Sequence, residues 1–279
     1  MIRRIAERVW PGGVDALEPL GGGITNHNFK VRVGDETFVL RIGGADTEQL
    51  GIDRSIEHDA SLAAAELGIG PSVVAFVEPE GYLVTRYVEG EVGRASVDEV
   101  ARLLRRFHGS RPIAGRFDSF RVVDTYAATA GEYGVSLPAV YERARATAAR
   151  IEAKRGRVPL HPCHDDLLAA NFIHDGERVW IVDWEYAGMG DPAFDLANFA
   201  VNNGLDEDGD RSLLDAYSAG ADYEIHVLMR FMSDFREAMW GVVQQALSEL
   251  DFDFAGYAAE HFERLERTAA EPRFRSALG

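Results

Sequence analysis

Short runs rich in apolar residues, each bounded by turn residues, dominate the first ninety positions of the chain. They cover residues 16–20, 28–33, 37–42, 73–77 and 82–87. Runs of this length and composition are typical of β-strands, so we expect a strand-rich region here. Residues 52–67 instead carry apolar side chains at helical spacing, and we expect that helix to end at Gly68.

The apolar pattern becomes mainly helical after Gly90. It predicts helices over 96–108, 118–132 and 138–153, and further helices between 195 and 271 with turns at 206–210 and 218–222. Three short apolar runs, 158–164, 171–174 and 179–182, lie between these groups. We therefore predict an α+β protein with a small antiparallel-sheet lobe over residues 1–88 and a helix-rich lobe over 89–279.

The charge of the chain narrows the range of partners. Its 279 residues include 29 lysines and arginines against 46 aspartates and glutamates, for a formal net charge of −17. So acidic a protein is not expected to bind nucleic acid or an anionic membrane. Two interpretations stay open at this point, attraction of a cationic ligand and simple solubility.

Cysteine content and hydropathy bear on the compartment. Cys163 is the single cysteine, so no disulfide can form within the chain. The first residues lack the apolar centre of a signal peptide, and no apolar run approaches the length of a membrane span. We expect a cytoplasmic protein; the oligomeric state is not predicted.

Candidate chemistry is concentrated in residues 161–199, HPCHDDLLAANFIHDGERVWIVDWEYAGMGDPAFDLANF. Asn171 begins one short strand and Asp183 follows another, with a turn at Asp175 and Gly176 between them. Two antiparallel strands joined by that turn bring Asn171 and Asp183 to one end, where an amide oxygen and a carboxylate suit Mg²⁺. Asp166, five residues before Asn171, is a candidate to orient an acceptor hydroxyl and take its proton.

Two alternative interpretations apply to this segment. Taken singly, these carboxylates are ordinary loop residues that cap turns. A zinc site of His161, Cys163, His164 and Asp165 is disfavoured because no second ligand pair follows at the spacing of zinc sites.

The segments CHDDLLAANF and IVDWEYAGMGDPAFDLANF carry a family resemblance. The chain resembles the choline/ethanolamine kinase branch of the aminoglycoside-phosphotransferase-like families, from about Leu17 to Phe262. The resemblance implies a protein-kinase-like bilobal fold and the use of ATP and Mg²⁺. It implies these roles: Asp166 as the catalytic aspartate, His164 as the organiser of its loop, Asn171 and Asp183 as Mg²⁺ ligands, Asp195 as the tie from the next helix, and Glu185 among the acceptor-side residues.

The first lobe offers candidate nucleotide-binding residues. The run GGGITNHNFKV at 21–31 resembles the nucleotide loop of this branch, which implicates Gly22, Gly23, Thr25 and Asn26. A plain glycine hairpin is the alternative. Arg41 on the next predicted strand and Glu57 on the following helix form a candidate pair for orienting phosphates. The alternative is that they form an ordinary surface ion pair. Tyr87 lies in the segment that we expect to contact adenine.

The segment 235–262 resembles the acceptor-binding helices of the same branch. Trp240 and Tyr257 match two residues of its aromatic wall, where a quaternary ammonium gains cation–π energy. The alternative is that both rings are ordinary core residues. Glu237 stands where many relatives carry a second tryptophan; it favours a primary ammonium such as ethanolamine if it faces the pocket, and it is irrelevant if it points to solvent.

These residues leave three functional hypotheses. The first is an ATP-dependent kinase for a small cationic alcohol, choline or ethanolamine. The second keeps the fold and changes the acceptor to an aminoglycoside, thiamine or an amino sugar, with the acidic run 206–210 contributing to a broad pocket. The third is a non-catalytic binding module of the same fold, which predicts the loss of a catalytic residue, and none is missing here.

Overall fold

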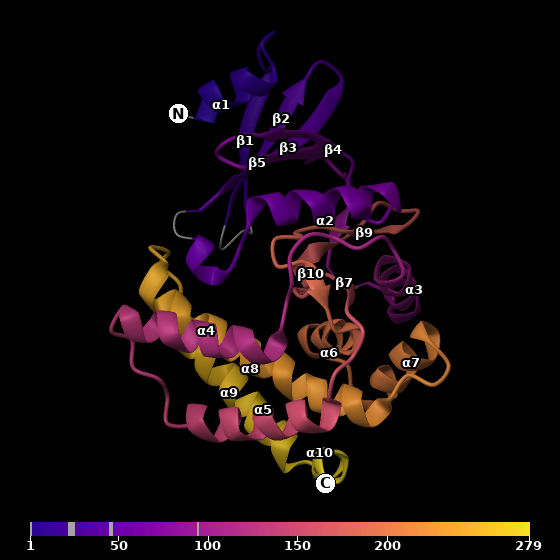
Figure 1. Ribbon diagram of the computed structural model, residues 1–279. Helices are drawn as coiled ribbons and strands as arrows, with labels where there is room; N and C mark the ends of the chain where they lie inside the picture. Colours follow the sequence, from indigo (N-terminus) through magenta and orange to yellow (C-terminus); the bar gives the residue numbers. More distant parts are fainter. Residues whose placement is uncertain (1, 22–25, 45–46, 94) are drawn as a thin grey trace. The chain divides into compact units, whose positions relative to one another are not determined.

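The computed structural model describes residues 2–21, 26–44, 47–93 and 95–279 (Figure 1). The chain divides into two compact units. The first, called here the sheet unit, comprises residues 1–95 and 169–186; the second, the helical unit, comprises residues 96–168 and 187–279. The return of residues 169–186 to the sheet unit was not predicted, and the proposed lobe boundary at 88/89 remains a prediction.

An antiparallel sheet of five strands forms the main part of the sheet unit, in the order β1-β2-β3-β5-β4. Its core comes from alternate residues, because successive side chains of a strand point to opposite faces. Phe29 and Val31 of β2, with Phe38 and Leu40 of β3, are buried. The elements that build this sheet are β1 (Ala16–Leu20), β2 (Asn26–Val33), β3 (Glu36–Gly43), β4 (Val73–Val77) and β5 (Tyr82–Arg86).

Helices flank the sheet strands along the chain. α1 (Ile2–Val9), which the sequence analysis did not predict, packs Ile5 against the sheet core. η1 (Thr47–Leu50) precedes α2 (Arg54–Glu66), whose N-cap Asp53 accepts a hydrogen bond from the Ser55 backbone N–H at 2.8 Å. α2 ends just before Gly68, where φ is +64°. The predicted helix 52–67 therefore agrees with the structure to within two residues.

A second, three-stranded sheet in the order β6-β8-β9 completes the sheet unit. β6 (Glu91–Val92) pairs with β8 (Phe172–His174), and β8 forms an antiparallel hairpin with β9 (Val179–Ile181). The short helix η2 (Ala169–Asn171) leads into β8. The hairpin is anchored on the rest of the unit because the Ile181 N–H donates to the Ile69 carbonyl at 2.9 Å.

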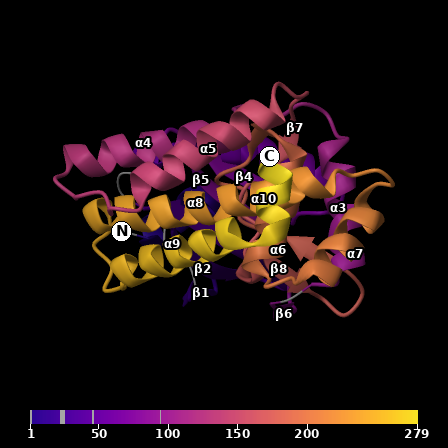
Figure 2. The ribbon, with the colours of Figure 1, turned by 90° about the horizontal axis from the view of Figure 1, so that it is seen from below.

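The helical unit is organised around α8 (Tyr223–Leu247), which is almost entirely buried from Ile225 to Gln244. α4, α6 and α9 pack along it, and Figure 2 shows α4, α5, α8 and α9 lying alongside one another. A two-stranded sheet pairs β7 with β10. The remaining elements are α3 (Val97–His108), α4 (Ser119–Glu132), α5 (Tyr141–Arg155), β7 (His161–Cys163), β10 (Gly188–Gly190), α6 (Pro192–Asn202), α7 (Glu207–Tyr217), α9 (Phe254–Ala270) and α10 (Pro272–Leu278).

One predicted turn is corrected. Residues 206–210 begin α7 rather than forming a turn, with Asp206 as N-cap accepting from the Gly209 N–H at 2.9 Å. An acidic run with a glycine resembles a turn in sequence, but carboxylates are also favoured at the positive end of a helix. Across the described ranges, no helix combines the length and the apolar character that crossing a membrane requires.

Candidate active site

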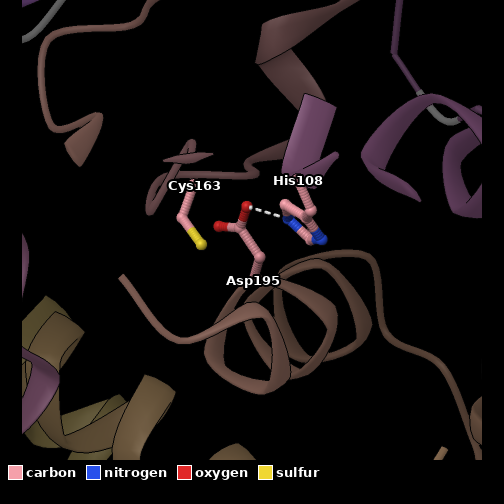
Figure 3. Close-up of side chains that lie close together, drawn as sticks. All are labelled: His108, Cys163 and Asp195. Carbon is pink, nitrogen blue, oxygen red and sulfur yellow. Dashed lines mark hydrogen bonds and ion pairs between the residues drawn. The ribbon is translucent and has the colours of Figure 1, made fainter. Parts of the chain in front are cut away.

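The loop that carries Asp166 is held by the first turns of α6. Both carboxylate oxygens of Asp195 are used: Oδ2 accepts from the His164 backbone N–H at 2.8 Å, and Oδ1 accepts from that of Asp165 at 2.7 Å. His108 of α3 places its Nε2 2.9 Å from the same Oδ2 (Figure 3). Burial works to raise the pKa of Asp195, but these hydrogen bonds outweigh it and the pKa lies below its ordinary value.

The same loop has further anchors, and the sequence analysis missed two of them, Asn198 and Asn203. The Leu167 N–H donates to Asn198 Oδ1 at 2.6 Å, and Asn203 Nδ2 donates to the Leu167 carbonyl at 3.1 Å. His164 is fully buried, and its Nδ1 accepts the Asp166 backbone N–H at 3.2 Å. The available signal was the spacing of Asp195 and Asn198 by one helical turn, which puts both on one face of α6.

His108, Cys163 and Asp195 form a buried cluster whose potential ligand atoms all lie within 4.8 Å of one another (Figure 3). Asp195 is already hydrogen-bonded by the loop, and His108 Nδ1 lies 2.9 Å from the Tyr217 hydroxyl. Burial raises the pKa of the Cys163 thiol, which disfavours the thiolate that a metal requires. The cluster therefore supports the loop, and its chemistry does not favour zinc.

Asp166 meets a group of residues from α8 and α9. Arg236 Nη1 donates to Asp166 Oδ1 at 3.0 Å and to Glu237 Oε1 at 2.7 Å. The Tyr257 hydroxyl donates to Glu237 Oε2 at 2.8 Å, and the Tyr257 ring lies edge-on to Trp240 with centroids 5.5 Å apart. The predicted acceptor residues of the helical unit thus lie in one connected group with Asp166.

Glu237 does not point to solvent, since only 2% of it is exposed. Burial works to raise its pKa, but Arg236, His261 and the Tyr257 hydroxyl outweigh burial, and the pKa of Glu237 lies below its ordinary value. Glu237 is therefore ionised at neutral pH, and each of its oxygens already accepts a hydrogen bond. Burial and Glu237 together raise the pKa of Tyr257, which keeps its hydroxyl protonated as the donor.

The oxygen-ligand candidates lie together in the sheet unit. Phe172 of β8 pairs with Ile181 of β9, and the Val182 N–H donates to the Asn171 carbonyl at 3.0 Å. Asn171 and Asp183 consequently flank the same end of the hairpin, as the turn at 175–176 predicts. Asp183 adopts a left-handed φ of +67°, which is uncommon for a residue other than glycine. An amide oxygen beside a carboxylate is a donor set that fits Mg²⁺.

Arg41 of β3 joins these residues to α2. Its Nη1 donates to Glu57 Oε1 at 2.9 Å and to Asp183 Oδ1 at 2.5 Å. Burial opposes the charge of Arg41, but Asp183 and Glu57 outweigh it and raise its pKa above the ordinary value. Glu57 is 1% exposed and also accepts from Arg54 Nη1 at 2.7 Å. Glu57 is therefore buried and the Arg41 side chain is only 13% exposed, so the alternative of a surface ion pair does not hold.

Asn26 and Glu185 lie together, although the sequence assigned them to different functions. Asn26 Nδ2 donates to Glu185 Oε2 at 2.8 Å, and both residues are buried. Arg54 Nη1 lies 3.3 Å from the same oxygen. These contacts connect Glu185 with the sheet unit's candidate nucleotide residues. Its assignment to the acceptor remains a prediction, as do the assignments of Gly22, Gly23 and Thr25, which lie outside the described residues.

A cavity of about 250 Å³ opens within the sheet unit beside these groups. Apolar side chains form much of its lining, and Arg41, Glu57 and Asp183 also line it. Tyr87 contributes to the wall, where its ring also lies under Lys30 Nζ at 4.0 Å from the centroid. A largely apolar cavity whose lining also holds a cation and carboxylates suits a flat base linked to phosphates.

Comparison with known proteins places the chain in a family. The sequence profile of the phosphotransferase enzyme family matches residues 16–235. A crystal structure of a choline/ethanolamine kinase family protein from Mesorhizobium loti is 33% identical, with a TM-score of 0.80 over 94% of this chain and 91% of that one. The chain therefore belongs to the phosphotransferase enzyme family and, within it, to the choline/ethanolamine kinase family.

Other similarities agree with this placement. The Protein LicA of Haemophilus influenzae is 27% identical over 70% of this chain and 61% of its own length, so this match spans less than two thirds of that protein. Choline kinase LicA from Streptococcus pneumoniae has the same fold, with 23% identity and a TM-score of 0.83 over 96% and 99% of the two chains. A LicA structure solved with AMP has a TM-score of 0.80 at 24% identity, covering 96% and 98%. The predicted family and α+β kinase-like fold class are confirmed.

Proposed function

We propose that the protein transfers the γ-phosphate of ATP to the hydroxyl of a small alcohol that carries one positive charge, with choline as the preferred acceptor. The observation that carries this proposal is the connected group of Asp166, Arg236, Glu237, Tyr257 and Trp240. It joins a carboxylate suited to proton transfer to an aromatic pair suited to a cation. Membership of the choline/ethanolamine kinase family supports the same reaction.

Residues of the sheet unit account for the nucleotide in this proposal. The apolar part of the cavity accepts adenine, and Arg41, held by Glu57, binds phosphate oxygens. Asn171 and Asp183 would hold Mg²⁺, which neutralises phosphate charge when bound. The LicA structure solved with AMP supports nucleotide binding by this fold.

In the helical unit, Asp166 orients the acceptor hydroxyl and accepts its proton as the oxygen bonds to phosphorus. Trp240 and Tyr257 receive the cationic end of the acceptor on their ring faces. The Tyr257 hydroxyl donates a hydrogen bond to Glu237, which makes the Tyr257 ring richer in electrons and so more attractive to a cation.

Glu237 determines which ammonium we expect to be preferred. Both of its oxygens already accept hydrogen bonds, from Arg236 and from Tyr257. Because only 2% of Glu237 is exposed, it attracts a cation mainly through its charge, and the N–H donors of a primary ammonium have little access to its remaining lone pairs. This reverses the sequence-based expectation that Glu237 favours ethanolamine.

The aminoglycoside alternative loses the acidic run that supported it. Asp210 is fully buried and bound to His226 Nε2 at 3.0 Å and Arg230 Nη1 at 2.6 Å. Asp206 caps α7. Asp210 thus holds α7 against α8, and the contacts of both carboxylates within the protein leave them poorly placed to bind a polycationic sugar.

The test measures ADP release from Mg·ATP with choline, ethanolamine, other amino alcohols, thiamine, glucosamine and kanamycin. We expect the highest kcat/KM with choline. Turnover of another acceptor, without turnover of choline, would retain the kinase reaction and reject choline as the substrate. The absence of ADP release with every acceptor would reject the proposal. Asp166→Ala serves as the chemical control: loss of the proton acceptor should lower kcat by about 10²–10⁴-fold while ATP still binds.

A further inference from the structure

Arg236 is the largest of the fully buried side chains among the described residues, with 1% exposed. It lies in the middle of α8, the central helix of the helical unit. A guanidinium is costly to bury unless charged groups compensate it. The sequence analysis gave Arg236 no role, so the reason for its position has to come from its contacts.

A single guanidinium nitrogen of Arg236 joins two carboxylates. Nη1 lies 3.0 Å from Asp166 Oδ1 and 2.7 Å from Glu237 Oε1. The side chains of Arg236 and Glu237 are each 2% exposed and that of Asp166 is 10% exposed, so solvent screens these charges weakly. The group carries two negative charges and one positive charge, which leaves one negative charge to match one cation.

The contacts continue from Glu237 to the aromatic pair. Glu237 Oε2 accepts from the Tyr257 hydroxyl of α9, and the Tyr257 ring packs edge-on against Trp240 of α8. Trp240 also packs edge-on against Phe254, with centroids 5.8 Å apart. Arg236 is therefore the link between the loop of Asp166 and the two helices that carry the aromatic pair.

We propose that Arg236 is a positioning residue that fixes the orientation of the Asp166 carboxylate and, through Glu237, ties it to the aromatic pair Trp240 and Tyr257. The proposal rests on the proposed function, because it takes Asp166 as the group that accepts the acceptor's proton. Arg236 holds Asp166 Oδ1, which restricts the rotation of the carboxylate that has to meet the hydroxyl. Lysine cannot replace it fully, because its ammonium sits on a flexible stem, whereas the planar guanidinium is pre-organised and loses less conformational freedom when Nη1 bonds both carboxylates.

The first comparison uses Arg236→Gln, Arg236→Lys and the control Arg230→Gln. Arg230 lies on the same helix and binds the buried carboxylate of Asp210, but that contact is separate from the group around Asp166. We expect kcat with choline to fall about 10²-fold in Arg236→Gln, since a misplaced catalytic group typically costs that much. Arg236→Lys should recover part of the loss, and Arg230→Gln should keep the parent kcat.

A double variant separates positioning from simple charge compensation. Arg236→Gln/Glu237→Gln removes the buried cation together with one carboxylate, so its melting temperature should rise from that of Arg236→Gln toward the parent value. If Arg236 positions Asp166, kcat stays low in the double variant. Recovery of the parent kcat there would overturn the proposal, because Arg236 would then serve only to neutralise Glu237.

A readout without acceptor distinguishes failure of this inference from failure of the proposed function. The ¹³C carboxyl resonance of Asp166, assigned with Asp166→Asn, can be titrated in the free protein. We expect its midpoint at higher pH in Arg236→Gln than in the parent and unchanged in Arg230→Gln. Equal midpoints in Arg236→Gln and the parent would overturn the inference, whereas a parent without kinase turnover would overturn the proposed function.

Discussion

At the scale of single residues, Asp165 is the most unusual group beside the catalytic candidate. It is fully buried, it adopts a left-handed φ of +64°, and within the described chain neither of its oxygens has a hydrogen-bond partner. Burial raises its pKa well above the ordinary value, and the charge of Asp195 adds to the rise. Asp165 is therefore protonated in the folded protein at a pH where the unfolded chain ionises it.

The first prediction concerns stability against pH. Because the folded pKa of Asp165 is raised, the folded state binds more protons, and stability declines as pH rises above the unfolded value of about 3.9. Asp165→Asn removes this dependence and tolerates the left-handed backbone, so its stability relative to the parent should rise by about 1.4 kcal/mol for each pH unit between the unfolded and the folded pKa of Asp165. Urea unfolding at several pH values between 5.5 and 8 should show a gain that grows with pH.

Asp215→Asn makes the same chemical change at an exposed position of α7. The free energy of unfolding of Asp215→Asn should differ little from that of the parent at every pH. A gain in Asp165→Asn that does not depend on pH would show that this carboxyl is not protonated in the folded state.

The second prediction concerns Trp240. A cation over a tryptophan face gains about 0.5–2 kcal/mol, so Trp240→Ala should raise the KM for choline by about 2–30-fold. The KM for ATP should stay at the parent value. The KM for choline of Trp240→Phe should lie between those of the parent and Trp240→Ala, because phenylalanine keeps an aromatic face. An unchanged KM for choline, measured by steady-state kinetics, would assign Trp240 to the core alone.

At the scale of elements, three segments far apart in the sequence meet at Arg41. It lies on β3, Glu57 lies on α2, and Asp183 follows β9. The N-cap Asp53 sets where α2 begins and so which of its residues face inward. Strand, helix and hairpin thus place one guanidinium between two carboxylates.

The third prediction follows from that arrangement. Hydrogen bonds to charged groups contribute about 1.5–3 kcal/mol, so Glu57→Gln should raise the KM for ATP by about tenfold or more through a misdirected Arg41. The KM for choline should be unaffected. Glu152→Gln, which breaks the exposed ion pair with Arg121, should change neither constant because surface pairs contribute little. Equal effects of the two substitutions on ATP would exclude a role for Glu57.

At the scale of the whole molecule, the net charge of −17 would act with opposite sign on the two proposed substrates. It would attract cationic choline and repel anionic Mg·ATP, and salt would screen both effects. The salt dependence therefore distinguishes the two interpretations of the acidic composition, attraction of a cationic ligand and simple solubility.

The fourth prediction is that kcat/KM for choline falls as ionic strength rises, by about threefold or more between 20 and 200 mM salt, while that for ATP does not fall. Dimethylbutanol, the uncharged isostere of choline, should show no such decline. A decline of equal size for both acceptors would mean that salt acts on the enzyme rather than on encounter with the cation.

Much of the fold follows from local patterns in the sequence. The strands at 16–20 and 73–77 and the helix ending before Gly68 lie where apolar spacing and caps predict them. These features are determined by neighbouring residues, so a single sequence contains the information. α1 was missed because its eight residues are short and only Ile5 and Ala6 are buried.

The sequence by itself determined the family, most of the order of the elements and the residue types of the site, because motif spacing and apolar periodicity are properties of the chain. Tertiary structure decided which of those residues touch. Arg236 occupies a helical position that looks like any other, and only the packing of α8 against the Asp166 loop makes its charge a link between two carboxylates. Glu237 likewise acquires its character from Tyr257 on another helix. Contacts between residues distant in sequence depend on how the elements pack, and the local pattern around each residue does not contain that information.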